Sequence, residues 1–132
     1  MKRLIPALSF FMVFLLASCA GKDLDLTIAT IVYDGSDHPL VAQMAQTLAD
    51  DIERVSGVRP DVAQGQADGP VVVLGTVGES SLLDDTDGLA GRWEAYKIKT
   101  SKNRIEVAGS DPRGLAYGVF HISEAIGVSP WY

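Results

Sequence analysis

Closely spaced carboxylates are the residues of this sequence that could most readily hold a metal ion. The run Asp84-Asp85-Thr86-Asp87-Gly88 has the composition of part of a calcium-binding loop. If residues 85–88 filled the third to sixth places of such a loop, Glu94 would fall in the twelfth, but Leu83 would take the first, where a carboxylate is needed. The residues after Glu94 also alternate like a strand and do not continue as the expected helix. We therefore expect a solvated acidic loop and no metal site.

A glycine-containing loop after the apolar run Val71–Leu74 could hold a phosphate on its backbone N–H groups. Its sequence, Gly75-Thr76-Val77-Gly78-Glu79-Ser80-Ser81, matches neither the P-loop nor the dinucleotide-binding fingerprint, and no lysine follows it. The carboxylate of Glu79 would also repel an anion. We favour a simple strand-to-helix turn at this position, and we expect no cofactor.

The two histidines and a few glutamates could in principle do acid–base chemistry. His121 and Glu124 are three residues apart on an expected helix and share a face, but no second pair of ligands completes a metal site. No Ser–His–Asp set can be assembled from His38 or His121. Glu94 and Glu124 could form the carboxylate pair of a glycosidase, although nothing in the sequence places them together. The residues alone therefore assign no catalytic residue.

The first residues predict a lipoprotein signal peptide over residues 1–18. Two basic residues precede an apolar run that is shorter than the roughly 20 residues of a membrane-spanning helix, and Leu16-Ala17-Ser18-Cys19 ends it in the manner of a bacterial lipobox. Cys19 is then the lipidation site, and Ala20 after it favours transport to the outer membrane, facing the periplasm or the cell surface. Residues 19–25 would form a polar tether. The alternative is an ordinary signal peptide with an incidental cysteine.

Charge excludes some partners. The whole chain has 11 basic and 17 acidic residues, and removal of Lys2 and Arg3 with the signal peptide leaves a formal charge of −8. Such a domain does not attract nucleic acid or anionic lipid, so we expect contact with the membrane only through the lipid anchor. A single cysteine excludes a disulfide framework within the chain.

Residues 26–132 predict one α/β domain, a two-layer sandwich of a mixed sheet covered by two helices. Strands are expected over Leu26–Tyr33, Asp61–Ala63, Val71–Leu74, Trp93–Thr100 and Arg104–Ala108. The first helix has Pro39 in its first turn and a glycine stop at Gly57, and the second has Asp111 as its N-cap and Pro112 at its first position. The last two strands should pair as a hairpin with one wetter face.

The sequence closes on Ser129-Pro130-Trp131-Tyr132. An apolar aromatic pair needs a surface to bury against, so we interpret Trp131 and Tyr132 as a junction to a further domain. The expectation is that the chain stops partway through a larger protein.

Several segments, in order, resemble the N-terminal region of glycoside hydrolase family 115, the xylan α-1,2-glucuronidases. These are Asp50–Pro60, Val72–Ser81, Gly91–Tyr96, Ala108–Gly114 with Tyr117-Gly118, and Ser123–Tyr132. The resemblance covers almost all of the expected mature chain. Pro112 departs from the lysine often found there, which is harmless at the first position of a helix.

The resemblance implies a non-catalytic domain that packs against its own missing catalytic barrel, in an intact enzyme that removes glucuronosyl branches from xylan. It also implies a fold similar to the second domain of β-N-acetylhexosaminidases. No catalytic residue can be carried onto this chain. Two alternatives stay open: a carbohydrate-binding lipoprotein with Trp93 and Tyr96 as an aromatic platform, or the equivalent domain of another barrel glycosidase such as a hexosaminidase.

Overall fold

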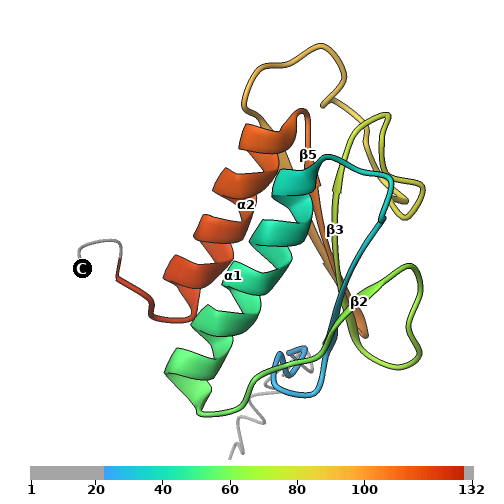
Figure 1. Cartoon of the computed structure of the whole chain (residues 1–132). Coiled ribbons are helices and arrows are strands. Elements are labelled where there is room, and N and C mark those ends of the chain that lie inside the picture. Colours follow the sequence, from blue (N-terminus) through green and yellow to red (C-terminus); the bar gives the residue numbers. More distant parts are fainter. Residues whose placement is uncertain (1–22, 130–132) are drawn as a thin grey trace, which may run out of the picture.

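The computed structural model describes residues 23–129, and the expected signal peptide, Cys19, Trp131 and Tyr132 lie outside this range. The described residues form a five-stranded sheet with two helices lying side by side in front of it (Figure 1). The elements in chain order are β1 (Thr30–Tyr33), α1 (Pro39–Ser56), β2 (Val62–Gln64), β3 (Val71–Thr76), β4 (Tyr96–Ser101), β5 (Arg104–Gly109) and α2 (Pro112–Ala125). The predicted two-layer α/β sandwich is confirmed.

The sheet is mixed, with the strand order β2-β1-β3-β5-β4. β1 pairs in parallel with both β2 and β3, β3 pairs in parallel with β5, and β4 and β5 form the predicted antiparallel hairpin. Every residue of β3 is buried, as expected for a central strand that is apolar on both faces. The carboxyl ends of β1, β3 and β5, three of the four parallel strands, therefore meet at one edge of the sheet, beside the start of both helices.

Local signals in the sequence explain where the helices begin and end. The ring nitrogen Nδ1 of His38 accepts the N–H of Leu40 at the start of α1, and Gly57 ends this helix with a left-handed φ of 80°. The Asp111 carboxylate accepts the N–H of Gly114 at 2.7 Å at the start of α2. Neither helix of residues 23–129 is long and apolar enough to cross a membrane.

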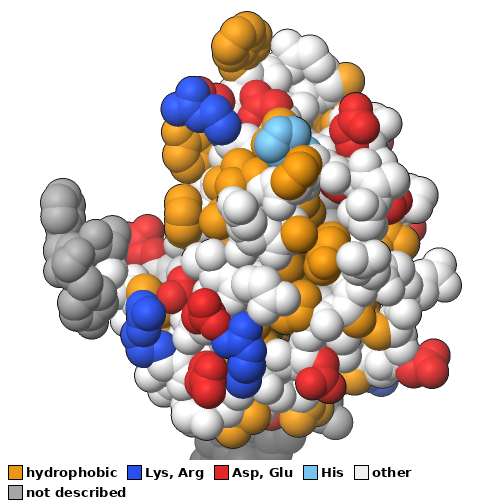
Figure 2. All heavy atoms as spheres, viewed as in Figure 1, with side chains coloured by type: hydrophobic (Ala, Val, Ile, Leu, Met, Phe, Trp, Pro, Cys, Tyr) orange, Lys and Arg blue, Asp and Glu red, His pale blue; other side chains and the backbone are white. Residues whose placement is uncertain are grey.

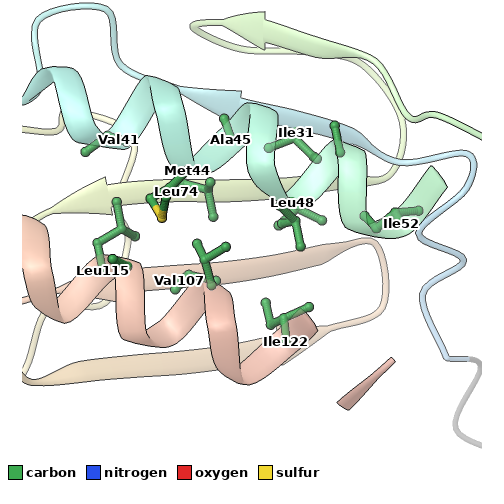
Figure 3. Close-up of a cluster of buried hydrophobic side chains, with 14 of the residues drawn as sticks. Ile31, Val41, Met44, Ala45, Leu48, Ile52, Leu74, Val107, Leu115 and Ile122 are labelled. Atoms are coloured by element: carbon green, nitrogen blue, oxygen red, sulfur yellow. The ribbon is translucent and has the colours of Figure 1, made fainter. Parts of the chain in front are cut away.

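The main core lies between the helices and the sheet (Figure 3). Ile31, Leu74 and Val107 face it from three neighbouring strands, and Leu48 and Leu115 reach it from the two helices. All five side chains are fully buried. Burial of side chains of this size stabilises the fold by about 2 kcal/mol each.

The opposite face of the sheet carries a second, smaller apolar cluster and is covered by the connection from β3 to β4. Val32, Val71 and Val73 form the cluster, and Leu82 and Leu83 of this connection pack against it. Residues 77–95 contain no helix, so the prediction of a strand-to-helix turn at Gly75–Ser81 is wrong in its second half. The connection instead lies along the sheet as an irregular loop, which we call the back loop.

Two predicted strands begin later than expected. Asp25 accepts the backbone N–H of Thr27 at 2.9 Å and its hydroxyl at 2.7 Å, so residues 25–28 form a turn and β1 begins only at Thr30. β4 begins at Tyr96 and not at Trp93, because Glu94 adopts a φ of 51° that no strand contains.

Candidate functional site

A crevice of about 470 Å3 lies at the carboxyl ends of the parallel strands, where open α/β sheets commonly bind ligands. Asp37 and His38 line it before α1, Thr76 and Glu79 line it after β3, and Asp111 lines it before α2. The three acidic side chains make it a poor site for phosphate.

The polar groups of this crevice are already used by the fold. The buried Asp37 carboxylate accepts the backbone N–H of Thr76 at 2.8 Å and also its hydroxyl, which joins the start of α1 to the end of β3. Asp111 accepts N–H groups from Glu94 at 2.8 Å and from Gly114. These backbone N–H groups, first that of Glu94, hold the pKa of Asp111 below its usual range. Asp37 and Asp111 therefore join elements of the fold together at this crevice.

The acidic stretch 84–88 belongs to the back loop and is anchored through its own charges and backbone. Asp85 lies 2.7 Å from Nζ of Lys97 on β4, and this lysine is the main reason why the pKa of Asp85 is lowered. The N–H groups of Asp84 and Asp85 both point to the buried Glu106 carboxylate on β5. Within residues 23–129 no three His, Cys, Asp or Glu side chains form a group that could hold a metal ion.

The structure does not bring the candidate catalytic carboxylates together. Glu94 forms an ion pair of 2.8 Å with Arg113 at the start of α2, whereas Glu124 lies at the end of this helix. Eleven residues separate Arg113 from Glu124, about 16 Å along the helix, which exceeds the roughly 5–10 Å between glycosidase carboxylates. His121 is likewise engaged, because its Nδ1 lies 2.7 Å from the hydroxyl of Tyr96.

The suggested aromatic platform is only half present. Trp93 is 88% exposed, and the backbone beside it is held by the bonds of Glu94 to Asp111 and of Ala95 to Ser110. Tyr96 is less exposed, with its ring in edge contact with His121. Trp93 is thus a solvent-facing ring on an anchored stretch of backbone, while Tyr96 is tied to α2.

Sequence reasoning missed a groove of about 510 Å3 between α1 and α2. Its walls combine exposed apolar, buried polar and charged side chains, which include Asp51, Arg54, Phe120, Ser123, Glu124 and Val128. The only signal in the sequence is that Phe120 interrupts the polar face of α2. The groove itself depends on how the two helices lie beside each other, which no local pattern reveals.

The fold and the arrangement of these residues define a mixed-sheet α/β domain with two helices on one face. The chain belongs to the family described as the glycosyl hydrolase family 67 N-terminus, whose model matches residues 17–122. No curated protein sequence matches the chain.

Solved structures extend this result. The chain is similar to a family GH115 4-O-methyl-α-glucuronidase, BtGH115A, described as having specificity for decorated arabinogalactans, with 30% identity and a TM-score of 0.69 over 79% of this chain. A GH138 enzyme targeting pectin rhamnogalacturonan II shares the fold at 20% identity and a TM-score of 0.54 over 76% of the chain. CpGH84D shares it at 15% identity and a TM-score of 0.56 over 81% of the chain.

The chain spans only a small part of each of these structures: 14% of the GH115 enzyme, 10% of the GH138 enzyme and 19% of CpGH84D. The family model and the GH115 structure together confirm the resemblance to an N-terminal domain of glycoside hydrolases.

Proposed function

We propose that this chain is the non-catalytic N-terminal domain of a GH115-type glycoside hydrolase that removes glucuronosyl branches from a plant polysaccharide. The observation that carries this proposal is the 30% identity to the GH115 4-O-methyl-α-glucuronidase along 79% of the chain. The ordered motifs from Asp50 to Tyr132 support the same family. The engaged state of Glu94, His121 and Asp111 favours a structural role for this part of the enzyme.

Expression of the chain alone and of the protein encoded by the uninterrupted gene tests the proposal. We expect the 132-residue chain to leave aldouronic acids unchanged and the longer protein to release 4-O-methylglucuronic acid. Turnover by the chain alone would contradict the proposal, as would a stop codon directly after Tyr132 in an intact genome.

Xylan is the substrate that we propose, and decorated arabinogalactan is the substrate class for which the GH115 relative is described. A formal charge of −8 on the mature domain makes it a poor holder of an anionic glucuronate, so the choice between the two polymers should rest with the catalytic domain. Initial rates of the longer protein on glucuronoxylan and on arabinogalactan, measured side by side, separate the two.

A carbohydrate-binding lipoprotein is the second candidate, favoured by Trp93. An indole ring that is 88% exposed and stands beside an anchored backbone is suited to stack on a sugar ring, and Arg113 and Glu94 would supply polar groups near it. Affinity electrophoresis in glucuronoxylan tests this function. Retardation that is lost in Trp93→Ala and kept in Ile28→Ala, a change of another exposed apolar residue far from Trp93, would support it; unretarded migration would exclude it.

We also propose that Cys19 anchors the protein to the outer membrane. The short apolar run and the Leu-Ala-Ser-Cys sequence support the proposal. Metabolic labelling with palmitate should mark the wild-type protein and not Cys19→Ser, which should leave the membrane fraction. Labelling of Cys19→Ser, or a soluble wild-type protein, would contradict it.

A further inference from the structure

The groove between α1 and α2 holds a polar group that the fold leaves without a partner. Ser123 is 4% exposed, and its Oγ has no hydrogen-bond partner among residues 23–129. A serine inside a helix commonly donates to the carbonyl four residues earlier, but this hydroxyl does not. A buried hydroxyl without a partner is costly, so a group that reaches it from outside would be stabilised.

Acidic side chains outnumber basic ones around the groove. Asp51, which is 8% exposed, has a single ion-pair partner in the described range, Arg54 at 3.4 Å. Asp50 on the rim shares Arg59 with Glu53. Glu124 has no ion-pair partner within residues 23–129. Three carboxylates and one guanidinium therefore line the groove and give it a net charge of −2.

The apolar part of the groove comes from Phe120, whose side chain is 49% exposed, and from Val128. Figure 2 shows charged side chains of both signs gathered over the lower ends of the two helices, with apolar surface above them. A half-exposed ring beside a buried hydroxyl and a buried carboxylate is a combination that suits an inserted side chain with an apolar body and an N–H-donating tip.

We propose that this groove is the docking site of the catalytic domain, which inserts a cationic or N–H-donating side chain between α1 and α2. The inference rests on the proposed function, because that function supplies the partner. Two observations favour this occupant. The negative charge of the groove is complementary to a donor, and Val128 forms part of its wall, so the chain passes the groove as it leaves α2. A linked domain would dock here at high effective concentration.

Calorimetry on the full-length enzyme tests the proposal. We expect the wild-type N-terminal and catalytic domains to unfold in one coupled transition. Phe120→Glu removes the apolar wall of the groove and sets a charge against the apolar body of the inserted side chain, and Glu124→Lys repels a cationic donor, so each should split this transition into two. Val58→Glu is the matched control, since Val58 is 50% exposed, lies outside the groove and acquires the same charge. It should keep the single transition.

Ser123→Ala should have opposite effects in the isolated chain and in the full-length enzyme. In the 132-residue chain it should leave the Tm unchanged or raise it, because it removes a hydroxyl without a partner in the described range. In the full-length enzyme it should weaken the coupling, because it removes the group that the inserted donor reaches. A parallel loss of Tm in both proteins would mean that Ser123 only supports the helix pair, and would overturn the proposal.

The outcomes separate failure of this inference from failure of the proposed function. An active enzyme whose single transition survives Phe120→Glu and Glu124→Lys overturns the docking site and leaves the function standing. A full-length protein without glycosidase activity or a second domain overturns both. Sedimentation of the 132-residue chain as a dimer that Phe120→Glu dissociates would assign the groove to a second copy and so overturn the catalytic domain as its occupant.

Discussion

Glu106 is a buried side chain that anchors the middle of the back loop. It stands on β5, is 3% exposed, and accepts hydrogen bonds from the backbone N–H groups of Asp84 and Asp85 and from Arg104 at 2.7 Å. Arg104 also donates to the carbonyl oxygen of Leu82. Burial alone would raise the pKa of Glu106, but the hydrogen bonds from Arg104 and the loop outweigh it, so the pKa lies below its usual range.

Removal of this carboxylate should be strongly destabilising. Glu106→Ala leaves two loop N–H groups without an acceptor and takes from the half-buried Arg104 its nearer carboxylate, with only the more exposed Asp84 left as an ion-pair partner, so we expect a loss of about 3 kcal/mol in the free energy of unfolding. Urea unfolding at pH 7 measures it. Glu79→Ala, a change of an exposed glutamate at the start of the same loop, is the control and should cost under about 0.5 kcal/mol. Equal effects of the two changes would show that the loop does not depend on Glu106.

Several carboxyls make stability depend on pH in the acid range. Asp34 accepts hydrogen bonds from Ser36 and Ser81, and these hold its pKa far below the usual range; the pKa values of Asp85, Glu106 and Asp111 are lowered as well. A lowered pKa in the folded state means that the unfolded chain binds more protons. The stabilisation is therefore complete above about pH 5 and is lost as the pH falls through the usual carboxyl range and below.

Urea midpoints at about pH 7 and about pH 3.5 should show this loss, with the lower midpoint at the acid pH. Asp34→Asn should reduce the difference between the two midpoints. Asp68→Asn, at an exposed carboxylate for which the described chain provides no hydrogen bond, should leave the difference as it is in the wild type. Identical midpoints at both pH values would contradict the lowered pKa values of these carboxyls in the folded state.

At the scale of elements, α2 lies against the sheet because two of its residues lack side chains. A Cβ added at Gly114 would collide with the backbone carbonyl of Ala95, and one added at Gly118 would lie 2.6 Å from Cγ1 of Val107. Gly114→Ala should therefore cost about 3 kcal/mol despite the better helix propensity of alanine, whereas Gly118→Ala should cost about 1 kcal/mol, because a side chain moves more easily than a backbone. Urea unfolding of both variants checks the order, and a reversed order would contradict it.

The sequence predicts elements well where the signal is local. The N-cap at Asp111 and the stop at Gly57 lie within a few residues of the groups they bond, and both are confirmed. The start of β4 is not predictable in this way, because the N–H of Glu94 bonds to Asp111, 17 residues away, a contact that no short window contains. The back loop and the groove beside Ser123 escape prediction for the same reason, since both are built by segments distant in the chain.

At the scale of the whole molecule, the sheet order could not be derived from the sequence, although its helix and strand content could. β1 ends up between β2 and β3, so the connection from β2 to β3 must cross the back face, where Ala67 packs near Val32. The two connections cover most of the back face, whereas the helix face carries the groove and the exposed aromatic residues of α2. The larger groove and these exposed aromatic side chains therefore lie on the helix side of the domain.

The exposed helix face predicts that the domain is only marginally stable when the chain is isolated. Tyr117 and Phe120 remain exposed on α2, Ser123 keeps a buried hydroxyl without a partner in the described range, and Trp131 and Tyr132 are proposed to form a junction with another domain. We expect a cooperative thermal transition of the 132-residue chain with a Tm below about 65 °C, the upper end for ordinary domains. Differential scanning calorimetry at neutral pH measures it. A Tm well above this value would show that the helix face needs no partner, and would count against a domain that is completed by its catalytic neighbour.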